Sequence, residues 1–138
     1  MRFRGFDLGN KKMISHEKLF GMDCSNEYPF LALLGGYCET YMEPLKVDIM
    51  QYTDIDDINN IEIYSGDIVK FHCSFLDEEE IEIVGEVIFK RGSFRIEYYT
   101  ENSQGILLKL GWSINDGNIT WIEVIGNIYE NPELLVKP

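Results

Sequence analysis

Apolar and polar residues alternate along much of the chain after residue 60. In one segment the apolar side chains are Val69, Phe71, Cys73 and Phe75, and the residues between them are polar. Because successive side chains of a β-strand point to opposite faces, this period of two predicts a strand with one buried face. Similar patterns predict further strands in residues 61–64, 81–90, 93–99 and 119–129. Residues 106–114 fit a strand, or a short helical turn followed by a strand.

Residues 1–15 have the pattern of a β-hairpin. Phe3 lies between Arg2 and Arg4, which gives one apolar and one charged face. The pair Gly9-Asn10 follows, and both residues tolerate the positive φ angles of a tight turn. We therefore expect two strands that turn at Gly9-Asn10. Other tight turns are expected at Arg91-Gly92 and residues 115–118, and Ser65-Gly66 fits a turn or a bulge.

Two glycines lie inside predicted strands. Gly85 predicts a bulge or a sharp bend, after which Val87 and Phe89 are expected to face inward. Gly126 predicts a bend in the last strand.

The end of the chain predicts a short helical plug. Asn131 can cap a helix, and Pro132 fits its first position, where no backbone donor is needed. The plug is expected to bury Leu134 and Leu135.

Short strands at close spacing, with almost no helical period, predict a mainly β fold. About five strands between residues 60 and 130 are enough for a small, strongly bent antiparallel barrel of the SH3-like kind. We therefore expect an N-terminal β subdomain over residues 1–49 and a barrel domain over residues 50–138, with little helix. Residues 16–49 have no clear period; residues 16–23 fit a short helix or an irregular link, and residues 28–42 fit two short strands around Gly35-Gly36.

The net charge of −12 is concentrated in one block. Residues 54–87 hold Lys70 and eleven acidic residues, a net charge of −10. Nucleic acids and anionic membranes attract cationic surfaces, so direct electrostatic binding to either is not expected. An acidic surface that keeps the protein in solution is the simplest explanation. The alternative is that the block imitates the phosphates of DNA and occupies a DNA-binding protein.

The cysteines and the apolar runs indicate a cytoplasmic protein. Cys24, Cys38 and Cys73 are an odd number without a close pair, which favours free thiols in a reducing compartment. No apolar run is long enough to cross a bilayer, and the start of the chain does not have the pattern of a secretory signal.

No combination of residues predicts catalysis or a bound cofactor. His16 and His72 are the only histidines, and neither belongs to a nucleophile signature, so we expect no enzymatic activity and no catalytic residue. The acidic run at residues 77–80 contains cation-ligand types, but neighbouring side chains on a hairpin tip point in alternating directions. A solvated tip that discourages edge pairing is the expected role. His72 and Cys73 are zinc-ligand types on opposite faces of one strand, so no zinc site is expected either.

Four aromatic residues are candidates for stacking on nucleic-acid bases: Tyr98, Tyr99, Trp112 and Trp121. Such platforms lie in basic grooves, and only Lys90, Arg91 and Arg95 cluster near them in the sequence. Packing in the core or in a subunit interface is therefore the expected role of most of these rings.

Three segments of the chain resemble the YopX-like family of phage and prophage proteins. "MQYTDIDDINNIEIYSGDIVKF" (residues 50–71) resembles the central signature of the family, and "IEVIGNIYENPELL" (residues 122–135) resembles its closing signature. "MRFRGFDLGNKKMI" (residues 1–14) resembles its opening. Three motifs in the same order make a more specific match than any one of them alone.

One departure from the family pattern is visible. The family usually has glycine after Gln-Tyr-Thr, where this chain has Asp54, and then a turn rich in lysine, asparagine and glycine. The corresponding residues 54–60 are acidic and contain no glycine. The departure changes the expected geometry of the turn and removes positive charge from it.

The resemblance implies a largely β protein encoded by phages or prophages of Gram-positive bacteria, with no established enzymatic activity and with members that form oligomers. It identifies no catalytic residue. We therefore expect a non-enzymatic structural or interaction module that self-associates in the host cytoplasm, with a host protein as a further candidate partner. The alternative is a modulator of a host nucleic-acid process, acting through its acidic face as a DNA mimic or through weak nucleic-acid binding by the barrel.

Overall fold

The structure is a computed structural model that describes residues 2–22, 30–32, 47–74 and 81–135. In these residues the chain forms β-strands and two 3₁₀ turns of three residues each, η1 (His16–Lys18) and η2 (Pro132–Leu134). The predicted mainly β fold with little helix is confirmed. No helix in the described part of the chain is long and apolar enough to cross a membrane. Contacts divide the chain into two compact units, Met1–Tyr52 and Thr53–Pro138.

The first unit is built around the predicted hairpin. β1 (Phe3–Asp7) pairs with β2 (Lys12–Ile14) on one side and with β5 (Val47–Asp56) on the other, antiparallel in both cases. The predicted hairpin is confirmed, but its positive φ angle falls at Lys11 (φ 54) and not at Gly9-Asn10. The Asp7 carboxylate explains the difference, because it accepts hydrogen bonds from the amides of Gly9 and Asn10 and so holds these two residues itself.

Residues 16–49 are described only in part. Where residues 16–23 fit a short helix or an irregular link, the structure has the 3₁₀ turn η1 and then the strand β3 (Leu19–Met22), which the sequence did not predict. One of the two strands expected in residues 28–42 is β4 (Phe30–Ala32), which pairs with β3. The turn at Gly35-Gly36 and the second strand lie outside the described residues.

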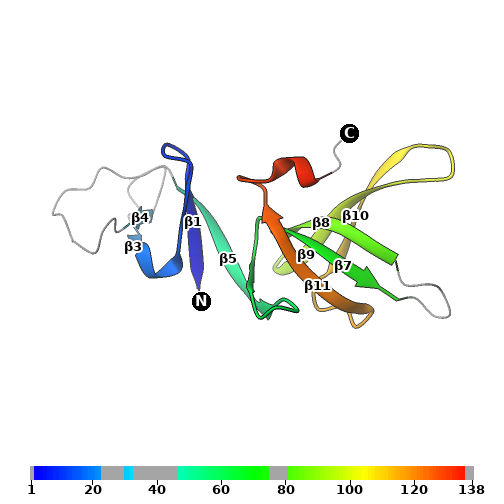
Figure 1. Cartoon of the computed structure of the whole chain (residues 1–138), viewed down its shortest axis with the longest axis horizontal. Helices are drawn as coiled ribbons and strands as arrows, with labels where there is room; N and C mark the ends of the chain where they lie inside the picture. The colour runs from blue at the N-terminus through cyan, green and yellow to red at the C-terminus, as the bar shows by residue number, and fades with distance from the viewer. Residues whose placement is uncertain (1, 23–29, 33–46, 75–80, 136–138) are drawn as a thin grey trace. The chain divides into compact units, whose positions relative to one another are not determined.

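The second unit contains a five-stranded antiparallel sheet in the order β10-β9-β8-β7-β11 (Figure 1). Its strands are β7 (Asp67–Cys73), β8 (Ile81–Lys90), β9 (Ser93–Glu101), β10 (Leu107–Ser113) and β11 (Ile119–Asn127). The predicted alternation in β7 is confirmed, because Val69, Phe71 and Cys73 are fully buried while Lys70 and His72 are half-buried. The core around these residues also contains Ile63 from β6 (Glu62–Tyr64), Val87, Ile96 and Tyr98.

The sheet is strongly bent at Gly85 in β8. Residues 81–86 pair with β7, and residues 86–90 pair with β9. A Cβ atom at Gly85 would stand 2.7 Å from the Glu97 carbonyl oxygen and 2.7 Å from Cγ2 of Ile96. The register with β7 continues through Gly85 without a shift, so the residue makes a sharp bend and not a bulge. Only a glycine lets β8 cross β9 at this distance.

Phe89 faces solvent, contrary to the prediction. Val87 is fully buried, but Phe89 is 52% exposed and packs against Phe94 at a ring-centroid distance of 4.9 Å. Phe89 is exposed because this end of β8 extends beyond the core. The strand turns back at Arg91-Gly92, where both residues have positive φ (53 and 77). That turn and the turn at Gly66 (φ 90) are confirmed.

The end of the chain also differs from the prediction. The register of β11 shifts between Val124 and Gly126, which confirms the bend. Asn131 makes no side-chain cap to η2, because its oxygen accepts a hydrogen bond from the Asn127 amide (3.3 Å) beside that bend. The predicted burial of Leu134 is wrong: η2 is one turn long, and Leu134 stays 37% exposed.

Candidate functional site

An apolar groove opens where β8 and β9 separate. Their pairing begins at Glu86 and Glu97; before this point β8 pairs with β7, and beyond it β9 continues with β10. The two strands therefore leave a groove of about 470 Å³ between them. The groove is lined by Ile81, Glu82, Ile83, Val84, Tyr98, Tyr99, Thr100, Leu110 and Leu135.

One wall of the groove continues along the β9–β10 hairpin. Trp112 of β10 packs against the core, and the preceding residues on the same side of the strand are Leu110, Leu108 and, just outside the strand, Ile106. As the hairpin extends away from the other strands of the sheet (Figure 1), these side chains lose their cover and are 43%, 40% and 53% exposed. Ile81 on the opposite wall is 46% exposed. We call Ile81, Ile106, Leu108 and Leu110 the apolar face.

The apolar face adjoins an edge of the sheet. In the part of the chain that the structure describes, β10 ends the strand order and pairs with β9 alone. Its outer backbone groups are therefore available to another strand. The opposite edge, β11, is covered: the amide of Ile58 donates to the Ile122 carbonyl (2.9 Å), and the amide of Val124 donates to the Asp57 carboxylate (2.9 Å).

Asp57 and Asp67 of the acidic block serve the fold. Asp57 is buried and also accepts the amides of Asn59 (2.8 Å) and Ile61 (2.9 Å). Asp67 is 1% exposed and accepts the amide of Tyr64 (2.8 Å). The Tyr64 amide is buried and would otherwise lack this partner, and Asp57 joins the loop at residues 59–61 to Val124. Both residues therefore have structural roles.

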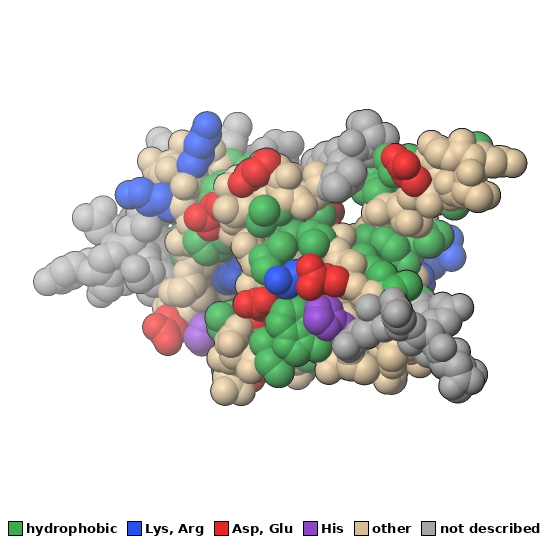
Figure 2. Space-filling model, turned by 45° about the vertical axis from the view of Figure 1, so that its right-hand side comes forward, with side chains coloured by type: hydrophobic (Ala, Val, Ile, Leu, Met, Phe, Trp, Pro, Cys, Tyr) green, Lys and Arg blue, Asp and Glu red, His purple; other side chains and the backbone are tan. Residues whose placement is uncertain are grey.

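The described acidic residues do not form one uniform surface. Glu82 contacts His72 (3.1 Å), and Glu123 pairs with Lys70 (3.8 Å). Figure 2 shows acidic, basic and histidine side chains scattered among apolar ones on the visible face. The acidic run at residues 77–80 lies outside the described residues, so its predicted role as a solvated tip stays a prediction.

The predicted separation of His72 and Cys73 is found. Cys73 is fully buried in the core, whereas His72 lies on the outer face, where it packs against Trp121 at a centroid distance of 4.6 Å. Burial, and then the charge of Asp116, raises the pKa of the Cys73 thiol, which keeps the thiol protonated and unreactive. No group of three metal-ligand residues occurs among the described residues.

The four aromatic candidates do not share one platform. Tyr98 lies in the core and accepts a hydrogen bond from the Trp112 indole (2.8 Å). Tyr99 contacts Lys109 from β10 (5.7 Å), whereas Trp121 lies on β11 at the other end of the strand order. Core packing is confirmed for Tyr98 and Trp112.

Lys90, Arg91 and Arg95, which cluster in the sequence, also line one groove in the structure. Sequence reasoning missed a fourth cation of this groove, Lys109, which β10 contributes. The sequence contains the information that could have identified Lys109, because the alternation in residues 107–113 places it on the face opposite to Leu108 and Leu110. The pairing of Lys109 with Tyr99 then brings it next to β9.

These features define a small, mainly β protein with a bent five-stranded sheet and an exposed apolar groove at one edge. The chain belongs to the YopX family: the family model described as YopX protein matches residues 2–136. The resemblance inferred from the three motifs is confirmed.

A solved structure supports the fold. The chain is similar to the crystal structure of protein EF1440 from Enterococcus faecalis, with 24% identity over 98% of this chain and 97% of that one and a TM-score of 0.61. Among curated proteins none matches the chain.

Proposed function

We propose that this protein is a non-enzymatic interaction module that self-associates through the apolar face. The observation that carries the proposal is the exposure of four large aliphatic side chains, Ile81, Ile106, Leu108 and Leu110, beside one groove and one strand edge. Single exposed leucines are ordinary on protein surfaces, but a set that adjoins an apolar groove is typical of an interaction site.

A second copy of the chain is the partner that we favour. Among the described residues no strand pairs with the outer side of β10. An edge of this kind, with exposed leucines and backbone groups on its outer side, is a template for pairing with another strand. A second chain placed along β10 would satisfy those backbone groups and cover Leu108 and Leu110 together. Each Å² of apolar surface removed from water would contribute about 25 cal/mol.

The setting that we propose is the cytoplasm of a bacterial host, with a phage or prophage as the source of the gene. The unreactive Cys73 thiol and the folding roles of Asp57 and Asp67 support a non-enzymatic role. The alternative function, a modulator of a host nucleic-acid process, stays a prediction. A pull-down from host lysate tests it, because recovery of no DNA- or RNA-handling protein would count against it.

Analytical ultracentrifugation of three proteins tests the proposed self-association. The wild type should sediment as an oligomer, and the double variant Leu108→Lys/Leu110→Lys should sediment as a folded monomer. Ile58→Lys is the matched control, since Ile58 is 56% exposed on the loop over the covered edge and its variant should associate like the wild type. A wild type that stays monomeric at high concentration, or a double variant that still associates, would refute the proposal.

A further inference from the structure

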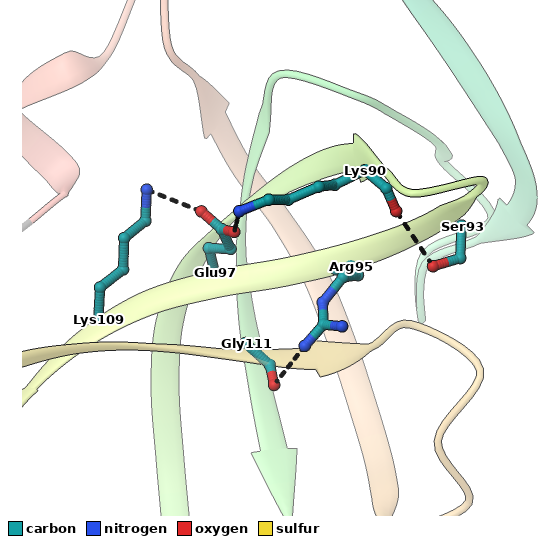
Figure 3. A network of polar contacts seen from close by, with 6 residues as sticks. All are labelled: Lys90, Ser93, Arg95, Glu97, Lys109 and Gly111. Carbon is teal, nitrogen blue, oxygen red and sulfur yellow. Dashed lines mark hydrogen bonds and ion pairs between the residues drawn. The ribbon is translucent and has the colours of Figure 1, made fainter.

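Four cationic side chains converge on a groove on the outer face of the sheet. Lys90 from β8, Arg91 from the following turn, Arg95 from β9 and Lys109 from β10 line a space of about 280 Å³. Figure 3 shows Lys90 and Lys109 reaching the carboxylate of Glu97, the acidic residue of the lining, while the Arg95 side chain points to the Gly111 carbonyl.

Glu97 neutralises only part of this charge. Its carboxylate accepts a hydrogen bond from Lys109 (2.7 Å) and contacts Lys90 (3.5 Å). The hydrogen bond from Lys109, aided by the charges of both lysines and opposed by burial, holds the pKa of Glu97 below its ordinary value. The groove therefore holds one ionised carboxylate and four cations, a local net charge of +3.

The two arginines keep donors for a ligand. Arg95 donates from Nη2 to the Gly111 carbonyl (3.2 Å), which fixes the guanidinium over β10 and leaves its other N–H groups for further bonds. Gly111 makes room for this arrangement, because a Cβ atom there would stand 3.2 Å from Nη2 of Arg95. Arg91 makes no hydrogen bond or ion pair with the residues that the structure describes, and its exposed side chain lines the groove.

This concentration of positive charge is unusual for this chain. Residues 53–138 contain six basic and 17 acidic residues, a net charge of −11, and four of the six bases line this groove. Closely spaced cations repel one another in the absence of an anion. A planar guanidinium also matches the paired oxygens of phosphate and carboxylate.

We propose that this groove binds a compact oxyanion, a phosphoryl or carboxylate group on a small ligand or a short protein segment. The groove is small and bounded, and Glu86 already acts on Lys109 from outside its lining. An extended nucleic-acid strand would reach beyond the four cations onto a strongly acidic unit, where its phosphates would be repelled. Lys109 lies on the face of β10 opposite to Leu108, and Leu110 lines both this groove and the apolar groove.

Nuclear magnetic resonance titration of the full chain with inorganic phosphate, at constant ionic strength, tests this proposal. The amide signals of residues 90–97 and 109–111 should shift saturably. Arg91→Ala should weaken phosphate binding about tenfold, because it removes charge-assisted hydrogen bonds. Lys11→Ala is the matched control, since Lys11 is also an exposed cation at a hairpin turn with nearly the same φ (54 against 53), and it should leave the affinity unchanged.

Two further titrations identify the source of the oxyanion. Acetate that shifts the same signals more strongly than phosphate would support the site and assign it to carboxylates, and the reverse order would assign it to phosphoryl groups. A short oligothymidylate that binds these residues more tightly than either anion would overturn the proposal, because the ligand would then be an extended strand. The absence of saturable shifts, or equal affinities of the wild type and Arg91→Ala for phosphate, would also overturn it.

Discussion

The two edge strands of the five-stranded sheet differ in whether another segment covers them. At β11, the loop that follows β5 lies along the strand and binds it through the Ile58 amide and the Asp57 carboxylate. At β10, the strand order ends, and Leu108 and Leu110 are exposed beside an apolar groove. A closed edge stabilises one chain, whereas an open apolar edge is suited to a partner. Asp57 fixes the loop on the closed edge, which leaves the open edge as the candidate for function.

The largest effect on stability is expected from a substitution that uncovers the closed edge. Asp57→Ala removes the acceptor of three amides, those of Asn59, Ile61 and Val124, and should cost about 3 kcal/mol or more of unfolding free energy. Urea unfolding measures the change. Leu108→Ala at the open edge is the comparison, and it should change stability by about 0.5 kcal/mol or less in the monomer. Equal losses of unfolding free energy in the two variants would show that the two edges do not differ in their contribution to stability.

The bend that creates the apolar groove is the next target. Gly85→Ala places a Cβ atom 2.7 Å from the Glu97 carbonyl and should cost about 2 to 3 kcal/mol, because β8 must move away from β9. Gly117→Ala is the control, since nothing lies within 4 Å of a Cβ there and the change should be neutral or slightly stabilising. Thermal unfolding of the two variants distinguishes them. A Gly85→Ala protein as stable as the wild type would show that the close crossing is not required.

A carboxylate also holds the turn of the first unit, which allows a smaller test by pH. Burial tends to raise the pKa of Asp7, but hydrogen bonds from the side chain and amide of Asn10 and the amide of Gly9 outweigh it and lower the pKa below 3.8. A carboxyl whose pKa is lower in the folded state stabilises the fold above the unfolded pKa, and this stability is lost as pH falls through the folded pKa.

Asp7→Ala should therefore cost about 1 to 2 kcal/mol at neutral pH and less below pH 4. Urea unfolding of both proteins across this pH range measures the difference. A loss that does not shrink in acid would mean that Asp7 acts through packing and not through its charge.

The smallest effect is expected at Asp54, which precedes the loop of the closed edge. Its φ of 62 lies in the left-handed region, which glycine adopts most easily. Asp54→Gly relieves this strain but makes the unfolded chain more flexible, so stability should change by about 1 kcal/mol or less. Asp54→Val should cost more, since a β-branched residue is poorly accommodated at positive φ. Melting temperatures in the opposite order would contradict this account of the turn.

The features predicted correctly from the sequence are mostly local. The alternation in β7 and the turn at Arg91-Gly92 depend only on residues adjacent in the sequence, so both could be predicted from it. The role of Asp57 could not, because its hydrogen bond to the Val124 amide joins residues 67 positions apart. The same limit applies to the candidate sites. The sequence around Leu108 is that of an ordinary strand. Its exposure depends on the distant bend at Gly85, where β8 separates from β9.

The most direct test of the open edge is hydrogen exchange of the wild type at low and high protein concentration. We predict that amides of β10 become more protected at high concentration, while those of β11 exchange at the same rate in both samples. Protection that increases at β11, or no concentration dependence at β10, would contradict the claim that this protein associates through its uncovered edge.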